Sequence, residues 1–115
     1  MRRLVLAFVN SWKGFKGALR FEAAFRQEVA LAVVLLPMGV WLGATGVEKA
    51  LLVSSVLLVL IVELLNTAIE KLCDHLSPAL SNQIKVVKDL GSAAVFVALV
   101  LAAAIWLLTV WRLLF

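Results

Sequence analysis

Long apolar runs, separated by short charged segments, divide this chain. Residues 29–47 and 90–111 contain no charged side chain, and residues 50–69 contain only Glu63. These runs of 19, 22 and 20 residues would each span about 30 Å as helices, which is the thickness of one bilayer core. The pattern therefore predicts three transmembrane helices.

The first 28 residues follow a different pattern. Their large apolar side chains recur every three or four positions, which places them on one stripe of a helix: Leu4, Phe8, Trp12, Phe15 and Leu19. Most of the basic residues fall off this stripe, as is typical of a helix that lies in the membrane interface. We therefore expect an all-α membrane protein with one domain over 1–115. It would have an amphipathic surface helix at 1–28 and a cytoplasmic loop at 70–89.

Composition supports this class. Apolar residues make up 64% of the 115 residues and charged residues 16%, whereas soluble domains average about 45–50% and 25%. A soluble domain is thereby excluded. A disulfide scaffold is excluded as well, because Cys73 is the single cysteine.

The basic residues predict the orientation in the membrane. Nine of the 11 Lys and Arg lie in residues 1–28 and 70–89, and cytoplasmic segments are enriched in these residues. We expect a bacterial inner-membrane protein with a cytoplasmic N-terminus and a periplasmic C-terminus. The net charge of +4 suits anionic headgroups of membrane lipids, so no nucleic-acid partner is expected.

Polar residues of the second run form the strongest functional signal. Glu63, Asn66 and Glu70 are spaced so that they share one helix face. Glu63 lies about two turns inside the expected boundary, where a carboxylate is costly and a functional role is the default interpretation. For Asn66, a hydrogen bond between helices is an equally good explanation.

Charged residues near the membrane boundary complete the candidate set. Glu22 and Glu28 lie in the basic N-terminal segment, where anionic headgroups would repel them, so we expect them to face protein or a cation. Lys88 and Asp89, taken alone, are explained by a snorkelling lysine and an acidic residue at a helix N-terminus.

Three segments carry a family resemblance: EAAFRQE at 22–28, VELLNTAIEKLCD at 62–74 and KDLGSAAV at 88–95. They resemble the signatures of the prokaryotic diacylglycerol kinase family, and the resemblance extends over nearly the whole chain. It implies a homotrimeric bundle, with three transmembrane helices and a surface helix per subunit. It also implies transfer of the γ-phosphoryl of MgATP to diacylglycerol, which gives phosphatidic acid.

The same resemblance implies roles for individual residues. Glu63 would be the base on the lipid hydroxyl, and Asn66 and Lys88 would assist catalysis. Mg²⁺ would be held by Glu22 and Glu70. The implied ATP contacts are Arg3, Asn10, Glu22, Glu70, Ala79, Leu80, Ser81, Lys88 and Asp89. The implied lipid contacts are Trp12, Lys16, Phe25, Arg26, Glu28, Trp41, Lys49, Glu63, Ser92 and Trp106. At Asn10 and Lys16 the chain departs from the aromatic residue and the arginine that members often carry.

Two alternatives stay open at this point. Relatives within the family phosphorylate undecaprenol, and the residues alone do not separate the two lipids. From a different class, a small proton- or cation-coupled transporter subunit would also carry an intramembrane glutamate such as Glu63. The clustering of the other carboxylates at one membrane face favours a surface active site. Oligomers are expected on physical grounds too, because three helices cannot enclose both substrates and shield Glu63. Sites shared between subunits would follow from such an assembly.

Overall fold

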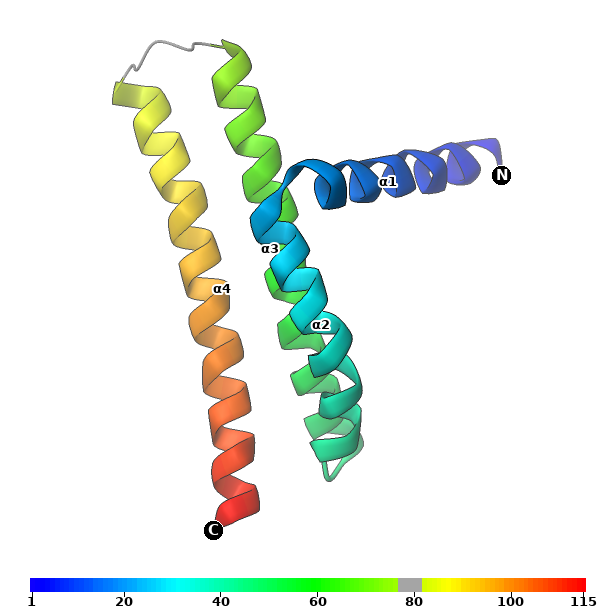
Figure 1. Ribbon diagram of the computed structural model, residues 1–115, viewed down its shortest axis with the longest axis vertical. Helices are drawn as coiled ribbons and strands as arrows, with labels where there is room; N and C mark the ends of the chain where they lie inside the picture. Colours follow the sequence, from blue (N-terminus) through cyan, green and yellow to red (C-terminus); the bar gives the residue numbers. More distant parts are fainter. Residues whose placement is uncertain (77–81) are drawn as a thin grey trace.

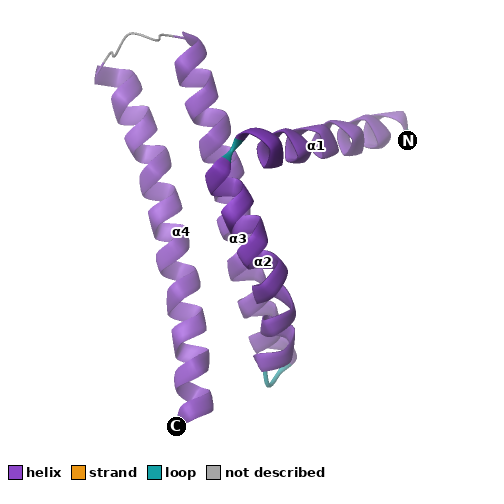
Figure 2. Cartoon of the chain, viewed as in Figure 1, coloured by secondary structure: helices purple, strands orange, loops and turns teal. Residues whose placement is uncertain are grey.

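The computed structural model describes residues 1–76 and 82–115, which form four α-helices and no strand. The helices are α1 (Arg2–Phe21), α2 (Ala23–Leu42), α3 (Gly46–Leu76) and α4 (Asn82–Leu114). Helices α2, α3 and α4 run up and down beside one another, with α3 packed against both neighbours, whereas α1 projects sideways from the bundle (Figure 1). Apart from the chain ends, the non-helical residues that the structure describes lie at the α1–α2 corner and in the α2–α3 hairpin (Figure 2).

The three bundle helices confirm the predicted fold class. Each is long and apolar enough to cross a membrane, with 20, 31 and 33 residues in α2, α3 and α4. A helix satisfies its own backbone hydrogen bonds, which the bilayer core cannot do. Most of the large apolar side chains are exposed on the bundle surface, as expected of side chains that contact lipid or another subunit.

The bounds of the elements differ from those expected. Helix α1 ends at Phe21, and the chain turns at Glu22, whose backbone is extended. Residues 23–28 therefore begin α2 rather than end the surface helix. The buried ring of Phe25 packs edge-on against Phe15, with the ring centroids 5.4 Å apart, and so fixes this corner.

The expected loop at 70–89 is also largely helical. Helix α3 continues to Leu76 and α4 begins at Asn82, so 70–76 and 82–89 extend the helices beyond the apolar runs. Hydropathy marks where a helix leaves the apolar core, not where it ends, and Glu, Lys, Leu and Gln in these extensions are good helix formers. The ATP contacts expected at Ala79, Leu80 and Ser81 lie outside the described residues.

Small residues bring the bundle helices close together. A Cβ at Gly39 of α2 would lie 3.1 Å from the Cβ of Leu52 and 3.6 Å from the ring of Trp106. The Trp106 indole N–H donates to the hydroxyl of Ser55 over 3.1 Å, which ties α4 to α3 inside the apolar region. These contacts hold the three helices at a fixed register.

An ion pair closes the end of the bundle that contains the α2–α3 hairpin. The Arg112 guanidinium pairs with the Glu48 carboxylate and also donates to the carbonyl of Leu42. Thr45 accepts a hydrogen bond from the Glu48 N–H at 3.1 Å and so caps the start of α3. The end of α4 is thereby tied to both of its neighbours.

Candidate active site

Carboxylates gather where the α1–α2 corner meets α3. Glu22 lies at the corner itself, and Glu63 and Glu70 lie on α3. The Glu63 carboxylate interacts electrostatically with Glu22, Glu70 and also Glu28, which lies in the first turns of α2. The structure thus brings together four of the predicted site residues within one chain. We call Glu22, Glu28, Glu63 and Glu70 the acidic cluster.

Asn66 links the acidic cluster to α4. Its side chain is buried, with 8% of the residue exposed, and its Nδ2 donates to Oε1 of Glu70 over 3.2 Å. Its Oδ1 has no hydrogen-bond partner among the described residues and faces Gly91 of α4, at the place where a Cβ would collide with it. Asn66 therefore both packs between two helices and orients one carboxylate, so the two interpretations of this residue are compatible.

Lys71 provides a positive charge that the sequence analysis missed. Its Nζ lies 3.3 Å from Oε1 of Glu22, which joins α3 to the α1–α2 corner. The position of Lys71 directly after Glu70 does not indicate that Glu22 is its partner, because Lys71 and Glu22 are far apart in the sequence. The only available signal was the unexplained Glu22, which needed a cationic neighbour.

Lys88 lies on α4 and pairs with a carboxylate outside the acidic cluster. Its Nζ lies 2.5 Å from Oδ1 of Asp74, near the end of α3. The sequence pattern does not reveal this pair, because Asp74 and Lys88 both fall within the loop expected at 70–89, whereas the structure places them on α3 and α4. Asp89 and Ser92 follow Lys88 along α4 and are exposed.

The predicted residues of the first helix and the corner have mixed surroundings. Arg3, Asn10 and Lys16 are exposed on α1. The Arg26 guanidinium donates to the carbonyls of Leu19 and Arg20 at the end of α1, over 3.1 and 3.0 Å. Arg26 therefore caps a helix C-terminus in this structure, and Phe25 is a core residue.

Other predicted lipid contacts lie away from the acidic cluster. Trp41 is exposed in the last turn of α2, and the Lys49 ammonium donates to the carbonyl of Val40, so both lie at the hairpin end. Trp106 and Glu28 line one cavity of about 330 Å³ between α2, α3 and α4. The Oε2 of Glu28 is buried there without a hydrogen-bond partner among the described residues.

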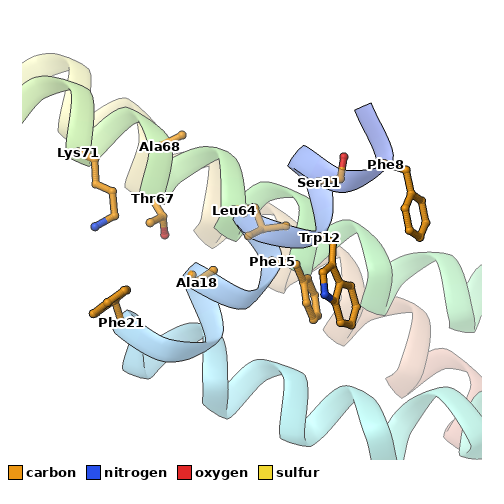
Figure 3. Close-up of a pocket in the computed structure, with 12 residues that line it drawn as sticks. Phe8, Ser11, Trp12, Phe15, Ala18, Phe21, Leu64, Thr67, Ala68 and Lys71 are labelled. Carbon is orange, nitrogen blue, oxygen red and sulfur yellow. The ribbon is translucent and has the colours of Figure 1, made fainter. Parts of the chain in front are cut away.

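An open groove separates α1 from the second half of α3. It has a volume of about 840 Å³, and most of its lining is apolar. Trp12 and Phe15 approach it from α1, whereas Leu64, Thr67 and Lys71 approach it from α3 (Figure 3). The groove therefore combines an apolar wall with one ammonium that is held beside the acidic cluster.

Comparison with known proteins identifies the family. The family model described as prokaryotic diacylglycerol kinase matches residues 9–110. The chain belongs to this family.

Individual relatives agree with this membership. A diacylglycerol kinase of Pseudomonas aeruginosa (strain PAO1) is 46% identical over 106 residues, which cover 92% of this chain and 86% of the relative. One from Escherichia coli (strain K12) is 39% identical over 109 residues, or 95% of this chain and 89% of the relative. One from Helicobacter pylori (strain 26695) is 35% identical over 105 residues, or 91% and 82%.

Membership of the prokaryotic diacylglycerol kinase family confirms the resemblance noted in the sequence. It makes the chain an enzyme, a kinase, and so favours phosphoryl transfer over the transporter alternative. The acidic cluster, Asn66, Lys71 and the Asp74–Lys88 pair are the chain's own candidates for that chemistry.

Two carboxylates of the acidic cluster are the residues that could hold a divalent cation. Among the described residues, no three His, Cys, Asp or Glu side chains lie close enough to hold a metal ion by themselves. Mg²⁺ in kinase sites is typically held by one or two carboxylates, with phosphate oxygens and water completing its shell. Glu22 and the oriented carboxylate of Glu70 supply hard oxygen ligands of this kind.

Proposed function

We propose that this chain transfers the γ-phosphoryl group of ATP to the hydroxyl of diacylglycerol and releases phosphatidic acid and ADP. The observation that carries the proposal is the acidic cluster, which lies at the level where the amphipathic α1 leaves the bundle. A helix of that kind lies in the membrane interface. The named relatives, all diacylglycerol kinases, supply the reaction.

Glu63 is the proposed general base. It lies on α3, and a carboxylate there can accept the proton of a lipid hydroxyl as the oxygen attacks the γ-phosphorus. Because the hydroxyl of diacylglycerol already sits at this depth, no lipid needs to leave the bilayer. Once Glu63 has accepted the proton, it is a neutral group among the carboxylates of Glu22, Glu28 and Glu70.

Glu22 and Glu70 are the proposed ligands of Mg²⁺, and Asn66 holds Glu70 in place for this role. The ion neutralises charge on the phosphates, and phosphoryl transfer depends mainly on such positioning and charge neutralisation. Lys88 is the proposed phosphate contact. To reach the nucleotide its ammonium exchanges Asp74 for a phosphate oxygen, at a position where the lysine is partly exposed.

The proposed site is shared between subunits of a homotrimer in the inner membrane. Within one chain, the α1–α3 groove is open, and Lys88 pairs with Asp74 rather than with the acidic cluster. A neighbouring subunit would close the groove and bring a second set of α1 and α4 residues to the cluster. The distribution of Lys and Arg favours a cytoplasmic face for the cluster and a periplasmic C-terminus.

The test is a phosphotransfer assay on the purified protein in lipid nanodiscs. Radiolabelled ATP is supplied with Mg²⁺, and diacylglycerol and undecaprenol are offered side by side. We expect label in phosphatidic acid, and none when Mg²⁺ is removed by a chelator. Label in undecaprenyl phosphate alone would show that undecaprenol, not diacylglycerol, is the substrate. The absence of any labelled lipid would contradict the proposed kinase activity.

A further inference from the structure

The Lys71–Glu22 ion pair has no role in the proposed reaction. The ammonium belongs to α3 and the carboxylate to the α1–α2 corner, and 3.3 Å separates Nζ from Oε1. The lysine side chain is 65% exposed and that of Glu22 is 31% exposed. A side chain so accessible can leave its partner without an unpaired charge becoming buried.

The pair places a single positive charge against a group of negative ones. Glu63 interacts electrostatically with both Glu22 and Glu70, so negative charge is concentrated at this place. Carboxylates that interact in this way repel one another unless a cation lies beside them. The Lys71 ammonium supplies part of the missing charge, at the carboxylate that we propose as a magnesium ligand.

The other basic side chains near the acidic cluster are engaged elsewhere. Lys88 pairs with Asp74, Arg26 donates to two carbonyls of α1, and Arg20 lies over the ring of Phe21, 5.3 Å from its centroid. Among the described residues, ion pairs therefore join the acidic cluster to Lys71 and to no other cation.

We propose that Lys71 is the resting counter-ion of Glu22, and that a divalent cation displaces it on binding. The inference rests on the proposed role of Glu22 as a metal ligand. Lys71 is a positioning residue in this scheme, because it acts through Glu22 and touches neither substrate. It keeps the carboxylate at the corner while the cation is away, and it competes with the cation for the same oxygens.

The competition sets the sign of the effect on metal affinity. Removing the lysine charge leaves Glu22 without its partner and the acidic cluster more negative, so a divalent cation binds more tightly. Exposed ion pairs are weak, and their removal corresponds to a change of about two- to five-fold in affinity. Because exposed charges are screened by salt, the gain should shrink as ionic strength rises.

The experiment measures Mn²⁺ binding to the full chain in nanodiscs, without nucleotide or lipid substrate, from the electron paramagnetic resonance signal of free Mn²⁺. The variants are Lys71→Met, which removes the charge, and Lys71→Arg, which keeps it. Lys85→Met is a matched control, because Lys85 is an exposed lysine of α4 outside the proposed site. Glu22→Gln reports which part of the binding belongs to the acidic cluster.

We expect Lys71→Met to lower the Mn²⁺ dissociation constant about two- to five-fold, and Lys71→Arg and Lys85→Met to leave it unchanged. Equal or weaker binding by Lys71→Met would overturn the counter-ion role alone and leave the metal site standing. If Glu22→Gln binds Mn²⁺ as tightly as the unaltered chain does, the metal role of Glu22 fails, and the role of Lys71 fails with it. Phosphotransfer measured separately shows whether the proposed function survives that result.

Discussion

Glu63 is the residue on which the proposed chemistry depends most. It lies on α3 among three other carboxylates, whereas polar side chains with a purely structural role in membrane helices are satisfied by a hydrogen-bonding neighbour. Asn66 shows the contrast, because its amide donates to Glu70 while its oxygen packs on Gly91.

Replacing Glu63 with Gln keeps the shape of the side chain and removes the base. We expect kcat to fall by roughly 10²–10⁴, the usual contribution of general base catalysis, with ATP affinity and oligomer size preserved. Steady-state kinetics and size-exclusion chromatography check the two parts. A variant with a near-normal kcat would remove Glu63 from the mechanism.

Gly91 offers a test of how Asn66 is held. A Cβ at this position would collide with the Asn66 oxygen, so Gly91→Ala should force α3 and α4 apart or turn the amide away from Glu70. We expect a loss of about 1–3 kcal/mol in stability, as is typical of overpacking, together with a lower kcat. Thermal unfolding in detergent and the lipid kinase assay measure these effects.

Gly14→Ala is the matched control for that substitution. A Cβ at Gly14 has nothing within 4 Å, and alanine favours a helix over glycine by up to about 1 kcal/mol. The control should therefore be as stable as the parent or slightly more stable. If both alanine variants behave alike, the contact between Asn66 and Gly91 does not matter.

At the scale of the elements, the sequence predicted what hydropathy controls and missed what packing controls. Three charge-free or nearly charge-free runs were enough to identify the bundle helices α2, α3 and α4. The break at Glu22 depends on Phe25 packing against Phe15, which no periodicity shows. The same holds for the Lys71–Glu22 and Asp74–Lys88 pairs, because each joins two elements whose relative placement the sequence leaves open.

The candidate site, like the fold, was predicted in part from the sequence. Spacing alone placed Glu63, Asn66 and Glu70 on one helix face, and the hydrogen bond between the last two agrees with it. The assignment of ten lipid contacts came from the family resemblance. The structure shows packing roles for Phe25, Arg26 and Trp106 within the chain, and their contact with lipid stays a prediction.

The acidic cluster draws its two proposed metal ligands from different elements, the α1–α2 corner and α3. If Glu22 and Glu70 hold one cation, Glu22→Gln and Glu70→Gln should each weaken MgATP binding at least several-fold. The double variant should be little worse than either single one, because residues that act as a unit are non-additive. Titration with a fluorescent ATP analogue gives the affinities, and fully additive losses would indicate two separate functions.

For the whole molecule, the open α1–α3 groove raises the question of what completes the site. If neighbouring subunits do so, the inactive variants Glu22→Gln and Lys88→Met should recover activity when they are mixed and reassembled. Some sites would then receive an intact copy of both groups. The recovered fraction should follow random assembly as the mixing ratio changes.

Cross-linking must show in parallel that mixed oligomers form. If they form and activity stays at the level of the separate variants at every ratio, each site is contained within one chain. The proposed function would survive that outcome, whereas the shared site would not.

The Arg112 contacts with Glu48 and Leu42 have a mechanical consequence. They join the end of α4 to the α2–α3 hairpin and so hold the three helices together at one end of the bundle. At the opposite end, where the acidic cluster lies, the Lys71–Glu22 and Asp74–Lys88 pairs join the elements, and such exposed pairs are weak enough to open. A lipid that diffuses in the plane of the membrane would therefore enter between helix ends that can part, while the far ends keep their alignment.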